Sequence, residues 1–130
     1  MARSRGWSTP PSLFANVVEQ DLAKRVRVIA MAMLNEIVLR SPVDTGRFRA
    51  NNIVSVGRPV YTSTENVDKS GGETISRGLS VTTGLEPYTV VFIQNSLPYA
   101  QRLEDGHSKQ APPGGIYAAS FNGVAQAYSR

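Results

Sequence analysis

The sequence predicts a single α+β domain, in which a long N-terminal amphipathic helix packs on a small antiparallel or mixed β-sheet and short helices occupy the C-terminal half. Three observations predict this fold class. Apolar residues recur every three or four positions over residues 12–40, which is the period of one helix face. Residues 88–94 (YTVVFIQ) are β-branched or aromatic at every position but the last, which favours a strand. At 130 residues, the chain has the length of one domain.

Residues 1–11 are predicted to form a flexible arm, and residues 12–130 the domain. The arm combines Arg3, Arg5, Gly6 and two prolines, a composition that does not hold regular structure. It also carries Trp7, the only tryptophan of the chain. A tryptophan on an arm typically anchors it, either to its own domain or to a neighbouring protein, and we favour the neighbour.

The predicted long helix starts after Ser12, which is a suitable N-cap, and ends before Pro42, because the residue before a proline resists helical dihedrals. Its predicted core stripe is Phe14, Val18, Leu22, Val26, Ile29, Met33 and Ile37, widened by Val17, Ala30 and Leu34. At 1.5 Å per residue this helix is roughly 40 Å long. That is long for the domain, so the helix either crosses a whole sheet or overhangs to meet another subunit.

A turn is predicted after the helix. Asp44 and Thr45 can accept backbone N–H groups, and Gly46 permits a positive φ, so the segment fits a tight capped turn. Asp-Thr-Gly is also the catalytic triplet of aspartic proteases, in which two carboxylates share a proton. The context disfavours that alternative, because the triplet follows Pro42 rather than an apolar strand and precedes the bulky Arg47.

The rest of the chain alternates between short strands and short helices. Residues 51–64 predict two short strands or one bulged strand, and residues 73–83 favour a helical turn after a polar loop. The strand at 88–94 is apolar on both faces and is therefore expected to be central or covered. A short helix follows, with Ser96 as its cap, Pro98 in its first turn, and Tyr99 and Leu103 packed inward.

That short helix is expected to end at Gly106, before an exposed, stiff loop at residues 107–115. The last predicted helix covers residues 116–128 and is interrupted by Gly123. His107 lies near Glu104 and Asp105, but two carboxylates and an imidazole at a helix end are ordinary surface residues. We therefore predict no metal site, no cofactor and no catalytic residue.

Composition excludes several function classes. The chain has no cysteine and one histidine, so disulfides, thiolate nucleophiles, cysteine zinc sites and multi-histidine metal sites within one chain are ruled out. The longest apolar run is residues 28–34, far short of the roughly 20 residues of a membrane span. No secretory signal is expected at the N-terminus. The sequence predicts a non-enzymatic protein that does not enter a membrane.

Charge is distributed unevenly. Arginine supplies 11 of the 14 basic residues. Residues 1–60 hold nine bases and four acids, a net charge of +5, whereas residues 61–130 hold five bases and six acids, a net charge of −1. A basic half can contact nucleic acid or an acidic protein face. A small basic DNA-binding protein without catalytic activity is therefore the alternative function, although neither interleaved aromatics nor a helix-turn-helix spacing supports it.

Two blocks of sequence carry a resemblance to a known family. The first block, residues 41–49 (SPVDTGRFR), directly follows the long helix. The second block, residues 95–106 (NSLPYAQRLEDG), runs into residues 108–112 (SKQAP). In this order and spacing the chain resembles the tail-completion proteins, also called neck or minor tail proteins, of long-tailed double-stranded DNA bacteriophages. It departs from the family at His107, where an aromatic residue is expected, at Pro113, and in residues 1–11, which have no counterpart.

The resemblance implies a structural role in the virion, with the α+β fold predicted above. The implied assembly is a homo-oligomeric ring, expected to be a hexamer, at the junction between head and tail. Its implied partners are head-closure or connector proteins on one side and the tail terminator or tail tube protein on the other, with possible non-specific contact to DNA in the lumen. The protein would be present in the host cytoplasm during assembly. The candidate interface residues are Trp7, Ser41, Pro42, Asp44, Thr45, Gly46, Arg47, Arg49, Tyr99, Leu103, Glu104, Gly106, Lys109, Gln110 and Pro112.

Overall fold

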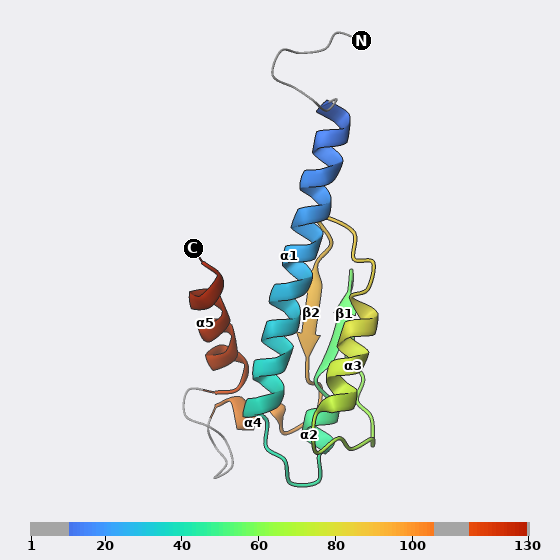
Figure 1. The fold of residues 1–130 in the computed structure, drawn as a ribbon. Coiled ribbons are helices and arrows are strands. Elements are labelled where there is room, and N and C mark those ends of the chain that lie inside the picture. The colour runs from blue at the N-terminus through green and yellow to red at the C-terminus, as the bar shows by residue number, and fades with distance from the viewer. Residues whose placement is uncertain (1–10, 106–114, 130) are drawn as a thin grey trace.

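The computed structural model describes the backbone of residues 11–105 and 115–129, and the side chains of residues 19–105 and 115–129. Within these ranges the fold is α+β, as predicted: one long helix, a two-stranded antiparallel sheet and four shorter helices (Figure 1). The elements are α1 (Pro11–Arg40), α2 (Arg47–Ala50), β1 (Ile53–Val56), α3 (Gly72–Val81), β2 (Val91–Gln94), α4 (Ala100–Glu104) and α5 (Tyr117–Tyr128).

Helix α1 is the axis on which the other elements pack. It has 30 residues and ends at Arg40, as the following Ser-Pro predicts. It begins at Pro11, so Ser12 lies inside the helix and the prediction of an N-cap at Ser12 is wrong; proline suits the first helical position because its missing N–H has no partner there. Figure 1 shows the N-terminal part of α1 extending beyond the sheet and the shorter helices.

The sheet is smaller than predicted. β1 and β2 pair antiparallel with Val54 opposite Ile93 and Val56 opposite Val91. Residues 57–64 form no strand. β2 begins at Val91, and Tyr88, three residues earlier, has a positive φ of 65°, which lies outside the strand region. The strand at 88–94 was expected to be central or covered; in this two-stranded sheet it is not central, but Val91 and Ile93 are covered because they pack against the core clusters. The side chains of residues 91–94 are half-buried, whereas Tyr88 and Val90 are exposed.

Two clusters of buried side chains hold the layers together. One cluster consists of Leu34 and Val38 of α1 and Val54 of β1, and Ile75 of α3 packs against it. Gly78 of α3 makes this close approach possible, since a Cβ there would lie 2.5 Å from Leu34 Cδ2. The other cluster lies at the C-terminal end of α1 and comprises Ile37, Phe48, Leu97, Leu103 and Ile116.

Helix α5 packs along α1 and runs antiparallel to it (Figure 1). The Arg25 guanidinium donates a hydrogen bond to the carbonyl of Tyr128 (3.3 Å), and Val124 is buried between the two helices. Gly123 lies within the helix and does not interrupt it, contrary to prediction. Helix α4 is shorter than predicted: Tyr99 occupies its N-cap position, and Ser96 and Pro98 precede it.

The buried face of α1 differs from the predicted stripe. Over residues 19–40, the part of α1 whose side chains the structure describes, the buried side chains are Ala23, Ala30, Leu34, Ile37 and Val38. Of the predicted stripe centre, Ile37 is buried, but Leu22 is 36% exposed and Val26, Ile29 and Met33 are only half-buried. The middle of α1 is apolar over a wide arc, so the sequence pattern alone does not show which part of the arc is covered. The uncovered part forms one wall of the groove described below.

Candidate functional site

The first block forms the corner between α1 and α2. Ser41 is buried, and its hydroxyl donates to the carbonyl of Ile37 (2.6 Å), which closes the last turn of α1. Thr45 Oγ1 accepts the N–H of Arg47 (3.2 Å), and Gly46 has a φ of 88°. Asp44 is exposed and accepts no hydrogen bond from the described residues. The predicted tight turn is therefore confirmed for Thr45 and Gly46.

A backbone hydrogen bond at Gly46 connects this corner to the loop that precedes α3. Its carbonyl accepts the N–H of Asp68 (2.9 Å). The Asp68 carboxylate in turn accepts the backbone N–H of Thr74 (2.7 Å) and of Gly71 (3.1 Å), which satisfies the start of α3. Desolvation alone would raise the pKa of Asp68, but hydrogen bonds from Thr74, Gly71 and Ser70 outweigh it and hold this pKa below 3.8.

The two arginines of the first block bind the protein's own backbone. Arg47 Nε donates to the carbonyl of Thr64 (3.3 Å). Arg49 donates to the carbonyl of Lys69 (2.8 Å) through one nitrogen and to that of Ser41 (3.2 Å) through another. Both side chains are half-buried. A structural role, holding the loop before α3 in place, therefore accounts for both arginines. Arg58, in contrast, is exposed.

A buried amide network connects the first block with the second. We define this amide network as Ser41, Asn52, Asn95 and Tyr117. Asn52 Nδ2 donates to Ser41 Oγ (3.0 Å), while Asn52 Oδ1 accepts from Asn95 Nδ2 (3.1 Å) and from the Tyr117 hydroxyl (2.7 Å). Asn52 is 2% exposed. Ser41, Asn52 and Asn95 each lie one residue beyond an end of α1, β1 or β2, and Tyr117 begins α5. Paired buried polar groups at these positions fix how the ends of the four elements are arranged.

Glu104 of the second block holds the start of α5. Its Oε1 accepts the N–H groups of Ile116 (2.9 Å) and Tyr117 (2.7 Å), and its Oε2 accepts that of Ala118 (2.9 Å). These are the unpaired donors of a helix N-terminus, where a carboxylate is favoured. Leu103 is buried as predicted, whereas Tyr99 is 38% exposed and contacts the Phe48 ring at 6.1 Å between centroids.

We expect Tyr117 to make the stability of the fold depend on alkaline pH. Burial, and then the negative charge of Glu104, raises the pKa of Tyr117 well above its usual 10. A raised folded-state pKa adds stability that is complete below the unfolded-state pKa and is lost as pH rises through the folded-state value. Above about pH 10 we expect the free energy of unfolding to fall by up to about 1.4 kcal/mol per pH unit because of this residue.

Urea unfolding at pH 8 to 11.5 checks this expectation. Tyr117→Phe should flatten the alkaline decline, and it should lower stability by about 1 kcal/mol at pH 8 through the lost hydrogen bond to Asn52. Tyr61→Phe, at a side chain that is 76% exposed, is the matched control and should match the wild type. Identical pH profiles for wild type and Tyr117→Phe would contradict the assignment.

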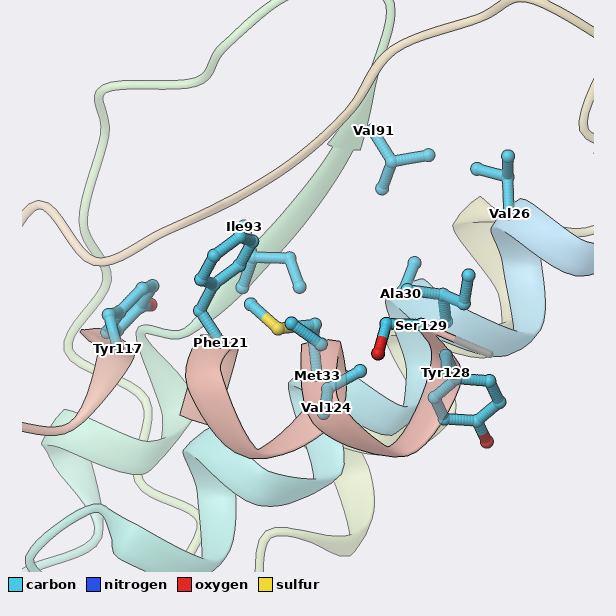
Figure 2. A pocket seen from close by; sticks show the side chains of 12 residues that line it. Val26, Ala30, Met33, Val91, Ile93, Tyr117, Phe121, Val124, Tyr128 and Ser129 are labelled. Carbon is cyan, nitrogen blue, oxygen red and sulfur yellow. The ribbon is translucent and has the colours of Figure 1, made fainter. Parts of the chain in front are cut away.

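An apolar groove opens between α1, β2 and α5, and its volume is about 600 Å³. Figure 2 shows the side chains around it, with α5 on one side and Val26 and Val91 on the other. Its lining residues are Val26, Ile29, Ala30, Met33, Val91, Ile93, Tyr117, Phe121, Val124, Ala125, Tyr128 and Ser129. None of these side chains is charged, so the groove suits an apolar occupant.

Helix α5 exposes an uncharged surface beside the groove. None of its twelve residues is charged. Two of its aromatic side chains are exposed to solvent, Phe121 by 60% and Tyr128 by 37%. Depletion of charge together with exposed aromatic residues is the composition of an interface core. The sequence indicated a helix here, but only the structure shows that its aromatic residues are left uncovered.

The structure therefore separates the predicted interface residues into two groups. Ser41, Gly46, Arg47, Arg49, Leu103 and Glu104 support the fold, whereas Asp44, Thr45 and Tyr99 are exposed and Pro42 is half-buried. Trp7, Gly106, His107, Lys109, Gln110 and Pro112 lie outside the described residues. Sequence reasoning missed Asn52, Asn95 and Phe121.

Over residues 11–105 and 115–129, no three histidine or acidic side chains gather where they could hold a metal ion. No helix in the same ranges is both long and apolar enough to cross a membrane. Comparison with protein-family models, with curated proteins and with solved structures finds no match to this chain.

Proposed function

We propose that this chain is a structural virion protein of the head–tail junction of a long-tailed double-stranded DNA bacteriophage. In this role it forms a homo-oligomeric ring, expected to contain six copies. The ring completes the tail or neck and joins head-closure or connector proteins to the tail terminator or tail tube. The protein is made in the host cytoplasm and becomes part of the virion.

One observation carries the proposal. The two blocks on which the family resemblance rests are about 45 residues apart in sequence, yet they meet at the same end of α1 through the amide network. The first block holds α1, α2 and α3 together, and the second fixes α4 and the start of α5. The two blocks therefore belong to one structural unit, as a resemblance that extends over the whole domain requires.

The exposed surface of α5 also supports the proposal that this chain is a repeated subunit of an assembly. An uncharged helix beside an apolar groove is a poor surface for a chain that remains alone in water, and it suits a contact with protein. Arg47 and Arg49 do not support the DNA-binding alternative, because their guanidinium groups donate hydrogen bonds to the protein's own backbone carbonyls. Arg58 is exposed, so Arg58→Gln is the cleaner variant for testing contact with DNA in the lumen.

In vitro joining of heads and tails tests the proposal. A phage stock in which this chain is not made should yield filled heads and separate tails. Addition of the purified protein should then restore joined, infectious particles by at least a hundredfold. Infectious particles formed at the normal yield without the protein would contradict the proposed function, and a soluble extract protein of similar size and charge serves as the control addition.

A further inference from the structure

The N-terminal end of α1 projects away from the rest of the domain. The loop before β2 reaches α1 near Gln20 and Lys24, where Leu85 and Pro87 lie beside the helix. Toward Pro11, Figure 1 shows no other element of the described chain alongside the helix backbone. The N-terminal end of α1 is therefore available for contact with another molecule.

The sequence of that end is apolar and uncharged. Residues 11–18 read PSLFANVV and contain no acidic or basic residue. Leu13, Phe14, Val17 and Val18 are spaced i, i+1, i+4 and i+5, which is the spacing of one helix face. An apolar helix face is what a hydrophobic groove recognises in helix-in-groove binding. The groove beside α5 has the matching chemistry, since no charged side chain lines it.

A chain cannot place this end in its own groove. Val26 to Met33 of α1 form one wall of the groove, and residues 11–18 precede that wall on the same continuous helix. At 1.5 Å per residue, Val18 lies roughly 12 Å beyond Val26 along the helix axis. The end therefore points past the groove of its own chain, and any α1 end that fills the groove belongs to another copy.

We infer that the α1–α5 groove of one copy binds residues 11–18 of a second copy. Each copy then offers one end and one groove, which is a head-to-tail contact, and such contacts close into a ring when the rotation between copies allows it. The inference rests on the proposed ring and specifies which surfaces make its subunit contact. A segment of eight residues buries less than a standard interface, so the contact is expected to be weak between free copies.

Cross-linking identifies the contact even when it is weak. The chain has no cysteine, so Phe14→Cys and Phe121→Cys each introduce the only thiol. At about 1 mM protein, a concentration that populates contacts with Kd near 1 mM, a short bismaleimide should link the two variants when they are mixed. The yield should be at least tenfold above that of Phe14→Cys mixed with Val67→Cys, which places its thiol at an exposed site outside the groove.

Other outcomes overturn the inference. Equal cross-linking of Phe121→Cys with itself would indicate a symmetric α5–α5 contact, and no mixed product at about 1 mM would indicate no contact. A nonpolar molecule that co-purifies with the wild type, and is lost in Phe121→Ser, would make the groove a ligand site. Adding Val26→Ser, at a half-buried residue that lines the groove, to the Phe121→Cys copy should lower the yield of the mixed product at least tenfold while the circular dichroism stays native. Adding Val67→Ser to the same copy should leave the yield unchanged.

The head–tail joining assay separates this inference from the proposed function. If the mixed cross-link forms but particles assemble normally without the protein, the contact stands and the proposed role in the virion is wrong. If joining requires the protein but Phe14→Cys and Phe121→Cys give no mixed product, the role stands and the ring is built through other surfaces.

Discussion

Replacing Gly46 with alanine should lower the free energy of unfolding by about 2–4 kcal/mol. Two costs combine at this position. A φ of 88° strains any residue with a Cβ by about 1–2 kcal/mol. The added Cβ would also lie 2.6 Å from the backbone nitrogen of Lys69 and 2.8 Å from that of Asp68, so the loop before α3 must move and weaken its hydrogen bond to Gly46.

Gly57 provides the matched control for this substitution. Its φ is 86°, but a Cβ there would meet nothing within 4 Å. Gly57→Ala should therefore cost only the backbone strain, about 1–2 kcal/mol. Urea unfolding of the two variants isolates the contact between the first block and the loop. Equal losses at the two positions would show that the contact contributes nothing and would contradict its assigned role.

Glu104→Ala should lower the free energy of unfolding by about 2–3 kcal/mol, because three N–H groups at the start of α5 lose a charged acceptor. The groove should also widen in Glu104→Ala, since α5 forms one side of the groove. Glu104→Gln keeps one acceptor oxygen of the same reach, so its loss should be about 1 kcal/mol.

Asp105→Ala is the control for Glu104→Ala. Asp105 is exposed, and within the described residues its side chain accepts one hydrogen bond, from Gln101, so its replacement should cost less than about 0.5 kcal/mol. Chemical denaturation gives the stabilities, and amide hydrogen exchange at Ile116 to Ala118 shows where protection is lost. Unchanged exchange at these amides in Glu104→Ala would contradict the capping role.

Local signals in the sequence predict most of the elements. The Ser-Pro dipeptide ends α1 where predicted, because its restriction acts on adjacent residues alone. The left-handed Gly46 and the helix at α3 were likewise predicted from neighbouring residues. The sequence predicted longer strands than the structure contains. A run of β-branched residues shows a preference for the strand conformation, but it does not show how many neighbouring strands are present to pair with it.

The candidate site depends on contacts between distant residues, which the sequence does not display. Asn52 and Asn95 look like ordinary turn residues in sequence, yet they are 43 positions apart and share a hydrogen bond. Glu104 was selected as an interface residue, whereas its carboxylate faces α5. On α1, Leu34 and Met33 are adjacent and equally apolar, but Leu34 is fully buried while Met33 lines the groove.

The mass of the assembled species tests the central claim most directly. Particles are purified, their head–tail junction complex is released with mild detergent, and the complex that contains this chain is measured by native mass spectrometry. A ring at the junction predicts that this complex contains several copies of the 14.1 kDa chain, six in the form that we expect, as counted by dissociating the complex in the mass spectrometer and weighing its subunits. Absence of the chain from purified particles, or its presence as a single copy, would contradict a repeated structural part.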